Sequence, residues 1–235
     1  MRLISYSILA LILYSCSATD DRVPQQPYEP IEETDTLHYL ALGDSYTIGQ
    51  SVAYAQNFPS QLKDSLEKNK NLPIQTEIIA VTGWRTDQLL SALHTGTQRA
   101  SYDFVTLLIG VNNQFQKRPF TQYENEFPEL LKRSVALAKG NSQKVIVISI
   151  PDYAYTPFGR HSNASESISS EIDTYNAFAK KITESFGAHF VNITAITREG
   201  LENPNLVASD GLHPSALAYK KFVEQIYPIA FPLVH

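Results

Sequence analysis

From residue 37 onward, the chain alternates between short apolar runs and longer stretches in which apolar residues recur every three to four positions. The first pattern is typical of strands and the second of amphipathic helices. The runs predict strands at 37–42, 74–81, 104–109, 145–150 and 189–193. The periodic stretches predict helices around 58–69, 86–94, 122–139 and 166–186, and a last helix that begins at Pro214 and continues through LAYKKFVEQI.

Two of the apolar runs, FVTLLI at 104–109 and VIVISI at 145–150, are nearly continuous in apolar residues. Such runs indicate strands that are buried on both faces of a parallel sheet. Because strands and helices alternate along the chain, we predict an α/β fold, a three-layer α/β/α sandwich with a mostly parallel five-stranded sheet. A chain of 235 residues is long enough to bury a large core in this way.

The first 36 residues follow neither pattern. Arg2 precedes an apolar run at 3–13, which is shorter than the roughly 20 residues that span a bilayer, so we interpret residues 1–15 as a signal peptide. The tetrapeptide LYSC at 13–16 resembles the lipobox of bacterial lipoproteins. The resemblance implies that Cys16 is lipidated and becomes the mature N-terminus. The alternative is an ordinary secretory signal with an incidental cysteine.

Residues 16–36 are acidic and contain several prolines, a composition that favours an extended tether over a packed core. We therefore expect a folded domain at 37–235. Cys16 is the chain's only cysteine, so no intrachain disulfide can form. The expected localisation is the bacterial cell envelope, as a periplasmic or outer-membrane lipoprotein whose membrane contact is the N-terminal lipid anchor.

The formal net charge is −5 at pH 7, and lysines and arginines form no dense stripe. This balance argues against nucleic acid as the principal partner.

Small and polar residues follow each of the first four predicted strands. The segments are Gly43-Asp44-Ser45, Thr82-Gly83-Trp84, Gly110-Val111-Asn112-Asn113 and Pro151-Asp152-Tyr153. Because the carboxyl ends of parallel strands meet at one edge of a sheet, we expect all four segments to lie at the same edge.

Ser45 needs a nearby base to act as a nucleophile, because a serine hydroxyl is weakly nucleophilic at neutral pH. Of the six histidines, His213 is the best placed, in the turn-rich SDGLHP segment before the last helix. Asp210 lies three residues upstream and can orient the imidazole. Acyl transfer also needs donors for an oxyanion, and the candidates are the amides of Ser45 and Gly83 and the side chain of Asn112.

These segments together resemble the SGNH hydrolases, also called GDSL lipases and esterases. GDSYTIG at 43–49 matches the nucleophile block, Gly83 the second block, GVNN at 110–113 the third and DGLH at 210–213 the last. The resemblance implies a flavodoxin-like SGNH fold, a triad of Ser45, His213 and Asp210, and an oxyanion hole of Ser45, Gly83 and Asn112.

The chain departs from the family pattern at two places. Asn113 stands where the third block usually has aspartate, and the asparagine often found shortly before the second block's glycine is missing, since Ala80 and Val81 precede Thr82. Neither departure removes an expected catalytic group.

The resulting hypothesis is a serine-dependent ester hydrolase that needs no metal and no organic cofactor. The family resemblance implies acyl esters of lipid or carbohydrate as substrates, without choosing among them. We expect the aromatic segment at 151–167 to determine selectivity, with Trp84, Tyr153 and Tyr155 as candidate substrate contacts. Tyr153 and Tyr155 fit a packed surface loop equally well, and Trp84 fits packing onto the domain in the same way. The sequence does not indicate the oligomeric state.

Two other interpretations remain open. A non-catalytic envelope lipoprotein could use the same edge of the sheet to bind glycans or lipids. Alternatively, the strand-end glycines could cradle a phosphate, although neither a GxGxxG nor a Walker pattern is present and Asp210 and His213 would then be unused.

Overall fold

The computed structural model describes residues 36–160 and 165–234. The predicted signal peptide, Cys16, His161 and the tether up to residue 35 lie outside the described residues. Within them, five parallel strands form one sheet in the order β2-β1-β3-β4-β5. The strands are β1 (Leu37–Gly43), β2 (Ile74–Ala80), β3 (Phe104–Leu108), β4 (Val145–Ile148) and β5 (His189–Val191).

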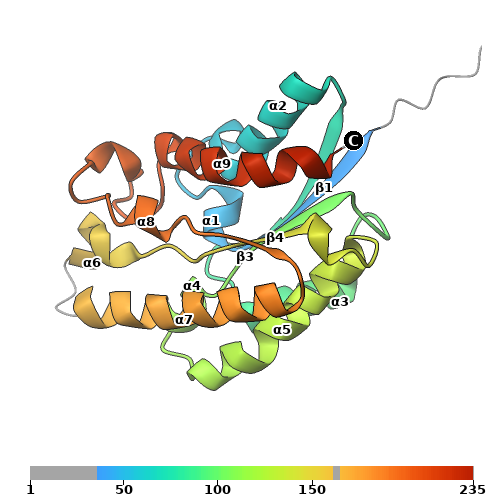
Figure 1. The fold of residues 1–235 in the computed structure, drawn as a ribbon. Helices are drawn as coiled ribbons and strands as arrows, with labels where there is room; N and C mark the ends of the chain where they lie inside the picture. The colour runs from blue at the N-terminus through green and yellow to red at the C-terminus, as the bar shows by residue number, and fades with distance from the viewer. Residues whose placement is uncertain (1–35, 161–164, 235) are drawn as a thin grey trace, which may run out of the picture. The chain divides into compact units, whose positions relative to one another are not determined.

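Helices cover both faces of this sheet, as Figure 1 shows. One face carries α2 (Phe58–Lys70) and α9 (Ala216–Ala230), and the other carries α3 (Thr86–Thr95), α5 (Phe120–Leu137) and α7 (Ser165–Ser185). The predicted three-layer α/β/α architecture and parallel sheet are therefore confirmed. The bounds of every strand, and of every long helix except α9, agree with the predicted ranges to within two residues.

Short helices also follow the strands, and the periodicity did not predict them. They are α1 (Ser45–Ile48), α4 (Val111–Phe115), α6 (Pro157–Arg160) and α8 (Thr194–Thr197). Short 3₁₀ turns lie at η1 (Tyr54–Gln56), η2 (Ser142–Lys144), η3 (Tyr153–Tyr155), η4 (Pro204–Leu206) and η5 (Phe231–Leu233).

The core forms where the apolar stripe of each helix meets the sheet. On α2, Phe58, Leu62 and Leu66 recur every four residues and are completely buried. Within the sheet, the Tyr39 ring on β1 stacks on the Phe104 ring on β3 with a centroid distance of 4.3 Å. Burial of these large apolar surfaces is the main force that holds the helices to the sheet.

The prediction that the last helix begins at Pro214 is wrong. Pro214 pairs with Val207 in an isolated antiparallel bridge, and α9 begins at Ala216. The Ser215 hydroxyl caps the helix by accepting a hydrogen bond from the Ala218 amide at 3.2 Å. Serine is a favoured cap because its hydroxyl satisfies an amide that has no partner inside the helix.

The strands end in register at one edge of the sheet. Gly43, the last residue of β1, pairs with Ala80 on β2 and with Leu108 on β3. The chain leaves β1 toward β2 on one side and returns to β3 on the other, so the strand order reverses at β1. Ligand sites of open α/β sheets form at such a point, outside the carboxyl ends of the strands.

Among the described residues, no helix combines the length and the apolar character that a membrane span requires. The same part of the chain contains no group of three or more histidine, cysteine, aspartate or glutamate side chains arranged to hold a metal ion.

Candidate active site

Ser45 is the first residue of α1, immediately beyond the end of β1. The Asp44 carboxylate caps this short helix by accepting a hydrogen bond of 2.9 Å from the Tyr46 amide. Gly43 is required where strand and helix meet, because a Cβ there would lie 2.1 Å from Thr47 Oγ1 and 2.4 Å from the Leu108 carbonyl oxygen. This tight turn places the Ser45 hydroxyl at the carboxyl edge of the sheet, where only 4% of the residue is exposed.

The structure brings Ser45, His213 and Asp210 together in one line of hydrogen bonds. His213 Nε2 lies 3.0 Å from Ser45 Oγ, and His213 Nδ1 lies 2.6 Å from Asp210 Oδ2. The other carboxylate oxygen of Asp210 accepts hydrogen bonds of 2.9 Å from the amides of Leu212 and His213. The carboxylate thus fixes both the ring and the backbone of His213.

Sequence reasoning missed Ser51, which also contacts Asp210. Its hydroxyl donates a hydrogen bond of 2.6 Å to Asp210 Oδ2. Desolvation by burial acts to raise the pKa of Asp210, but the hydrogen bonds from Ser51, Leu212 and His213 outweigh it and hold that pKa well below its ordinary value. Asp210 is therefore ionised at neutral pH and can stabilise a charged imidazole.

The loop that carries His213 is fixed to its surroundings by backbone hydrogen bonds. The Ala208 amide donates to the His213 carbonyl at 2.7 Å, and the Phe158 amide on α6 donates to the Gly211 carbonyl at 2.9 Å. The Tyr46 ring packs against the imidazole with a centroid distance of 4.9 Å. These contacts restrict the position of the ring that faces Ser45.

The remaining expected oxyanion donors, Gly83 and Asn112, follow β2 and β3. Gly83 has φ +82°, a conformation that favours glycine, and its carbonyl accepts a hydrogen bond of 2.8 Å from Gln116. Asn112, on α4, donates from Nδ2 to the Trp84 carbonyl at 3.1 Å and to Asp44 Oδ2 at 3.4 Å. The Asn112 amide is therefore held beside the turn that carries Ser45.

Asp44 is completely buried, and its carboxylate has few partners. Desolvation raises the pKa of Asp44 to about 7, and the hydrogen bonds from Tyr46 and Asn112 only partly oppose the shift. A titratable group thus lies directly beneath the serine, and it changes charge near neutral pH.

The three predicted substrate contacts have different environments. Trp84 is half-buried and packs partly against the core, while its carbonyl binds Asn112. Tyr153 is buried, and its hydroxyl donates to Gln114 Oε1 at 3.0 Å. Tyr155 is exposed and faces the Arg198 guanidinium, 6.0 Å from the ring centroid.

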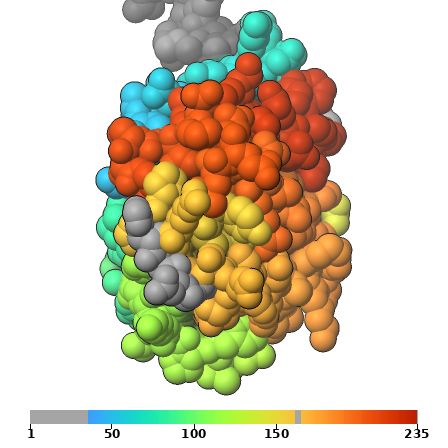
Figure 2. Space-filling model, turned by 90° about the vertical axis from the view of Figure 1, so that its left-hand side faces the viewer, coloured from blue at the N-terminus to red at the C-terminus, as the bar shows by residue number. Residues whose placement is uncertain are grey.

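A groove with a volume of about 1030 Å³ lies between α4, η3 and α7. Figure 2 views this end of the sheet and shows the segment that follows β4 (yellow) between the C-terminal part above (orange-red) and the region near α4 and α5 below (light green). The lining includes Tyr153, which also contacts the small space next to His213, but it does not include Ser45 or Tyr155.

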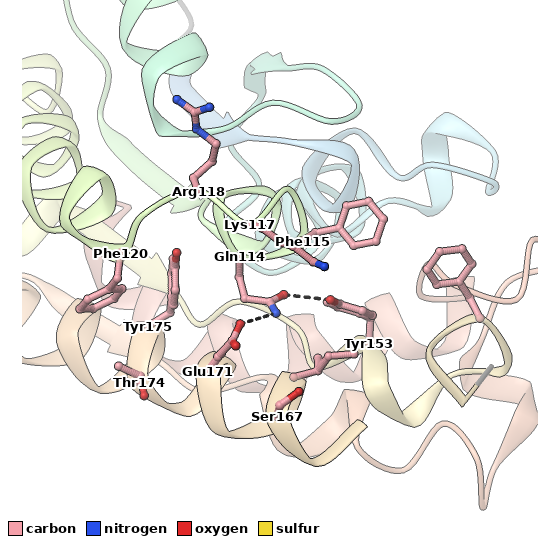
Figure 3. A pocket seen from close by; sticks show the side chains of 12 residues that line it. Gln114, Phe115, Lys117, Arg118, Phe120, Tyr153, Ser167, Glu171, Thr174 and Tyr175 are labelled. Atoms are coloured by element: carbon pink, nitrogen blue, oxygen red, sulfur yellow. Dashed lines mark hydrogen bonds between the residues drawn. The ribbon is translucent and has the colours of Figure 1, made fainter. Parts of the chain in front are cut away.

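The groove has both aromatic and polar walls, as Figure 3 shows. Phe115 and Phe158 are 47% and 45% exposed, and their ring centroids are 6.0 Å apart. On the floor, Gln114 donates to Glu171 at 2.8 Å and accepts from Tyr153. A ligand in the groove would meet flat apolar faces next to a fixed amide and a carboxylate.

A serine, a histidine and a carboxylate in one line of hydrogen bonds at the edge of an α/β sheet form the arrangement that serine hydrolases use. The model of the GDSL-like Lipase/Acylhydrolase family matches residues 41–221, and the chain belongs to this family. The protein is accordingly a carboxylic ester hydrolase, as expected from the four sequence blocks.

Solved structures share this fold at low sequence identity. The acetylxylan esterase Axe2 from Geobacillus stearothermophilus is 20% identical with a TM-score of 0.64, and the alignment covers 85% of this chain and 96% of Axe2. TesA is 14% identical with a TM-score of 0.65, covering 84% and 99%. A lipolytic G-D-S-L family protein from Veillonella parvula DSM 2008 is 15% identical with a TM-score of 0.62, covering 81% and 96%. No curated protein is significantly similar to the chain in sequence.

Proposed function

We propose that Ser45, His213 and Asp210 hydrolyse acyl esters by covalent catalysis. Ser45 Oγ attacks the acyl carbonyl while His213 Nε2, 3.0 Å away, accepts its proton. The imidazolium then protonates the leaving alcohol, and the acyl group remains on Ser45. Water, activated by the same imidazole, attacks this acyl-enzyme and releases the acid, which restores the Ser45 hydroxyl.

The tetrahedral intermediates carry a negative charge on the former carbonyl oxygen. We assign its stabilisation to the amides of Ser45 and Gly83 and to the side-chain amide of Asn112, because these groups follow strands that end in register. Such donors lower the barrier when they point toward the charge before it forms, and for Asn112 this requires that its weaker hydrogen bond to Asp44 Oδ2, at 3.4 Å, opens. Asp210 stabilises the imidazolium without taking its proton.

The hydrogen bond between His213 Nε2 and Ser45 Oγ carries this proposal, since a binding protein has no need to direct a base at that hydroxyl. The test compares the domain lacking residues 1–36 with its Ser45→Ala variant on p-nitrophenyl acetate, butyrate and octanoate. We expect the variant to lose all but a small fraction of kcat at unchanged melting temperature. Ser185→Ala, at an exposed position on α7, is the control.

If Ser45→Ala keeps its activity, the hydrolysis does not use Ser45 and the proposed mechanism is wrong. If the folded wild-type domain hydrolyses none of the three esters and is not labelled by a serine-reactive phosphonate, the non-catalytic glycan- or lipid-binding lipoprotein becomes the better interpretation.

We further propose that the substrate is an acyl ester of a carbohydrate rather than of a lipid. The groove supports this choice because the exposed faces of Phe115 and Phe158 suit stacking against sugar rings. A lipid chain would instead remove water from the Glu171 carboxylate and the Gln114 amide without replacing it by hydrogen bonds, which is unfavourable. Sugar hydroxyl groups can hydrogen-bond to both.

The substrate class is tested by comparing kcat/KM on two substrates of different size. For Phe115→Ala and Glu171→Gln, we expect the ratio of kcat/KM on an O-acetylated oligosaccharide to that on p-nitrophenyl acetate to fall by about tenfold, the value of one lost contact of about 1.4 kcal/mol. Glu124→Gln, exposed on α5, is the control. A ratio that stays constant, or a loss confined to p-nitrophenyl octanoate, would contradict the carbohydrate assignment.

The location is a separate proposal, which rests on the sequence. We propose that Cys16 anchors the protein to a membrane of the bacterial cell envelope through a lipid. The full-length chain, expressed in a bacterium, should incorporate labelled palmitate and fractionate with membranes, whereas Cys16→Ala should do neither. Equal fractionation of the two proteins would show that Cys16 is not the anchor.

A further inference from the structure

The loop between β2 and α3 carries Gly83, and side chains from α4 and the residue after it hold that loop from one side. Gln116 binds the Gly83 carbonyl, Asn112 binds the Trp84 carbonyl, and Asn113 binds Thr86 at the start of α3. Of these contacts, the pair Asn113 and Thr86 is completely buried. It therefore fixes the end of the loop where water cannot substitute for a lost hydrogen bond.

Asn113 and Thr86 exchange two hydrogen bonds, and the Thr86 hydroxyl continues the chain to Glu126 on α5. The Thr86 amide donates to Asn113 Oδ1 at 3.1 Å, and Asn113 Nδ2 donates to Thr86 Oγ1 at 2.7 Å. The Thr86 hydroxyl in turn donates its single proton to the Glu126 carboxylate. Because that proton is used on Glu126, the hydroxyl can only accept from residue 113.

This direction explains why an asparagine stands at 113. An aspartate would present two acceptors, and the Thr86 hydroxyl cannot donate to that aspartate and to Glu126 at once. While the hydroxyl stays on Glu126, which also accepts from Gln122 Nε2 at 3.1 Å, one oxygen of the buried aspartate would lack a donor, with a second carboxylate one hydroxyl group away. Both effects are unfavourable, since a buried charge needs compensating hydrogen bonds.

We propose that Asn113, Thr86 and Glu126 form a directional hydrogen-bond chain that positions the Gly83 loop for oxyanion binding. These three are positioning residues, because none of them is assigned contact with the reacting atoms. The inference rests on the proposed role of the Gly83 amide. It assigns a function in this chain to the asparagine that replaces the family's usual aspartate.

The test is a double-mutant cycle on p-nitrophenyl acetate. We expect Asn113→Asp to lower kcat by about tenfold with little change in KM, because a loop displaced by a fraction of an ångström weakens transition-state binding more than substrate binding. Adding Glu126→Gln to Asn113→Asp should restore kcat to within about threefold of wild type. The glutamine amide can then donate to Thr86 Oγ1 while the hydroxyl donates to the new aspartate, so the bonds of the Thr86 hydroxyl reverse.

Controls separate positioning from folding. Asn125→Asp makes the same chemical change at an exposed neighbour of Glu126, and melting temperatures show whether each variant is folded. If Asn113→Asp does not fold, Thr86→Val removes the hydroxyl alone. Its kcat should then fall, Glu126→Gln should not rescue it, and Thr86→Ser should lose less.

The proposal is wrong if the rescue of Asn113→Asp fails in a folded double variant, or if Asn113→Asp lowers the melting temperature without lowering kcat. The proposal is also wrong if Thr86→Val keeps the kcat of the wild type. Failure of the proposed function has a different signature, which is unchanged hydrolysis by Ser45→Ala.

Discussion

Ser51 and Asp210 are 159 positions apart in sequence, and the serine hydroxyl donates a hydrogen bond of 2.6 Å to the aspartate. The bond ends on Oδ2, the same oxygen that holds His213 Nδ1. Ser51 itself has φ +69°, a conformation that is unusual for a residue other than glycine. The segment after α1 therefore supports the acid through the same oxygen that orients the histidine.

Removing this contact should weaken catalysis. We expect Ser51→Ala to lower kcat by about three- to tenfold, because a hydrogen bond to a charged group contributes about 1.5–3 kcal/mol and water replaces part of it at this exposed position. Steady-state kinetics on p-nitrophenyl acetate measure the effect, with Ser185→Ala as the control. A kcat equal to that of wild type would show that the amides of Leu212 and His213 suffice to hold Asp210.

Asp210→Asn tests the carboxylate itself. The amide keeps the shape of the side chain but cannot stabilise an imidazolium, and it favours the wrong tautomer of His213. In serine hydrolases with a buried carboxylate this change lowers kcat by about 10⁴. Because the Asp210 side chain is 29% exposed, we expect a smaller loss, of about 10²-fold, at unchanged KM. A loss below about fivefold would mean that the backbone alone orients His213.

Asp44 should give the stability of the protein a distinctive pH dependence. Burial raises its pKa in the folded state to about 7, from an ordinary value of 3.8. Between these values the folded protein binds more protons at this site than the unfolded chain, so the contribution of Asp44 to stability falls as pH rises. Above about pH 7 the carboxylate is charged in both states, and the penalty is constant.

Melting temperatures measured from pH 5 to pH 8 check this expectation, with pH 7 as the midpoint of the folded-state titration. The melting temperature of the wild type, relative to that of Asp44→Asn, should fall steadily from pH 5 to about pH 7 and stay constant above it. Asp64→Asn, on the exposed side of α2, is the control and should run parallel to wild type. Parallel curves for Asp44→Asn and wild type would show that Asp44 titrates at the same pH in the folded and unfolded chains.

Gly43→Ala should destabilise the fold at the turn before Ser45. The added methyl group would overlap Thr47 Oγ1 and the Leu108 carbonyl oxygen, and overpacking of this kind costs about 1–3 kcal/mol. Because a domain of this size loses about 2–4 °C per kcal/mol, we expect a drop of about 2–12 °C in melting temperature. Thr47→Ala added to Gly43→Ala should recover part of the loss. An unchanged melting temperature would mean that the turn relaxes without strain.

The strands could be predicted closely because burial on both faces of a sheet leaves an unbroken apolar signal, as in FVTLLI and VIVISI. The positions of Ser45 and Asn112 followed from the ends of the first and third strands, whereas His213 was selected for its turn-rich segment and for Asp210 three residues upstream. The short helices α1 and α4 could not be predicted, since four or five residues are too few to show a helical period. The predicted start of the last helix is two residues early, because a proline signals a helix start from sequence but the Ser215 cap sets it in the fold.

Contacts between distant segments are the other part that the sequence leaves open. Ser51 meets Asp210, and Thr86 meets Asn113 and Glu126, only because the fold brings two loops and three helices together. No local motif marks Ser51, Thr86 or Glu126. Their partners become apparent from the register that aligns the ends of β1, β2 and β3.

The groove and the reacting groups are built by different parts of the chain. Apart from α4, the groove walls come from η3, α6, α7 and the start of α5, which carry none of the reacting groups proposed here. We therefore expect changes at the exposed groove residue Phe158 to redirect specificity while the chemistry stays in place. Exchange of the whole segment 153–160 is limited by its buried residues Tyr153, Ala154 and Thr156, and by one backbone atom. The amide at position 158 holds the Gly211 carbonyl in the histidine loop, so a transplanted segment must offer an N–H there and cannot place proline at that position.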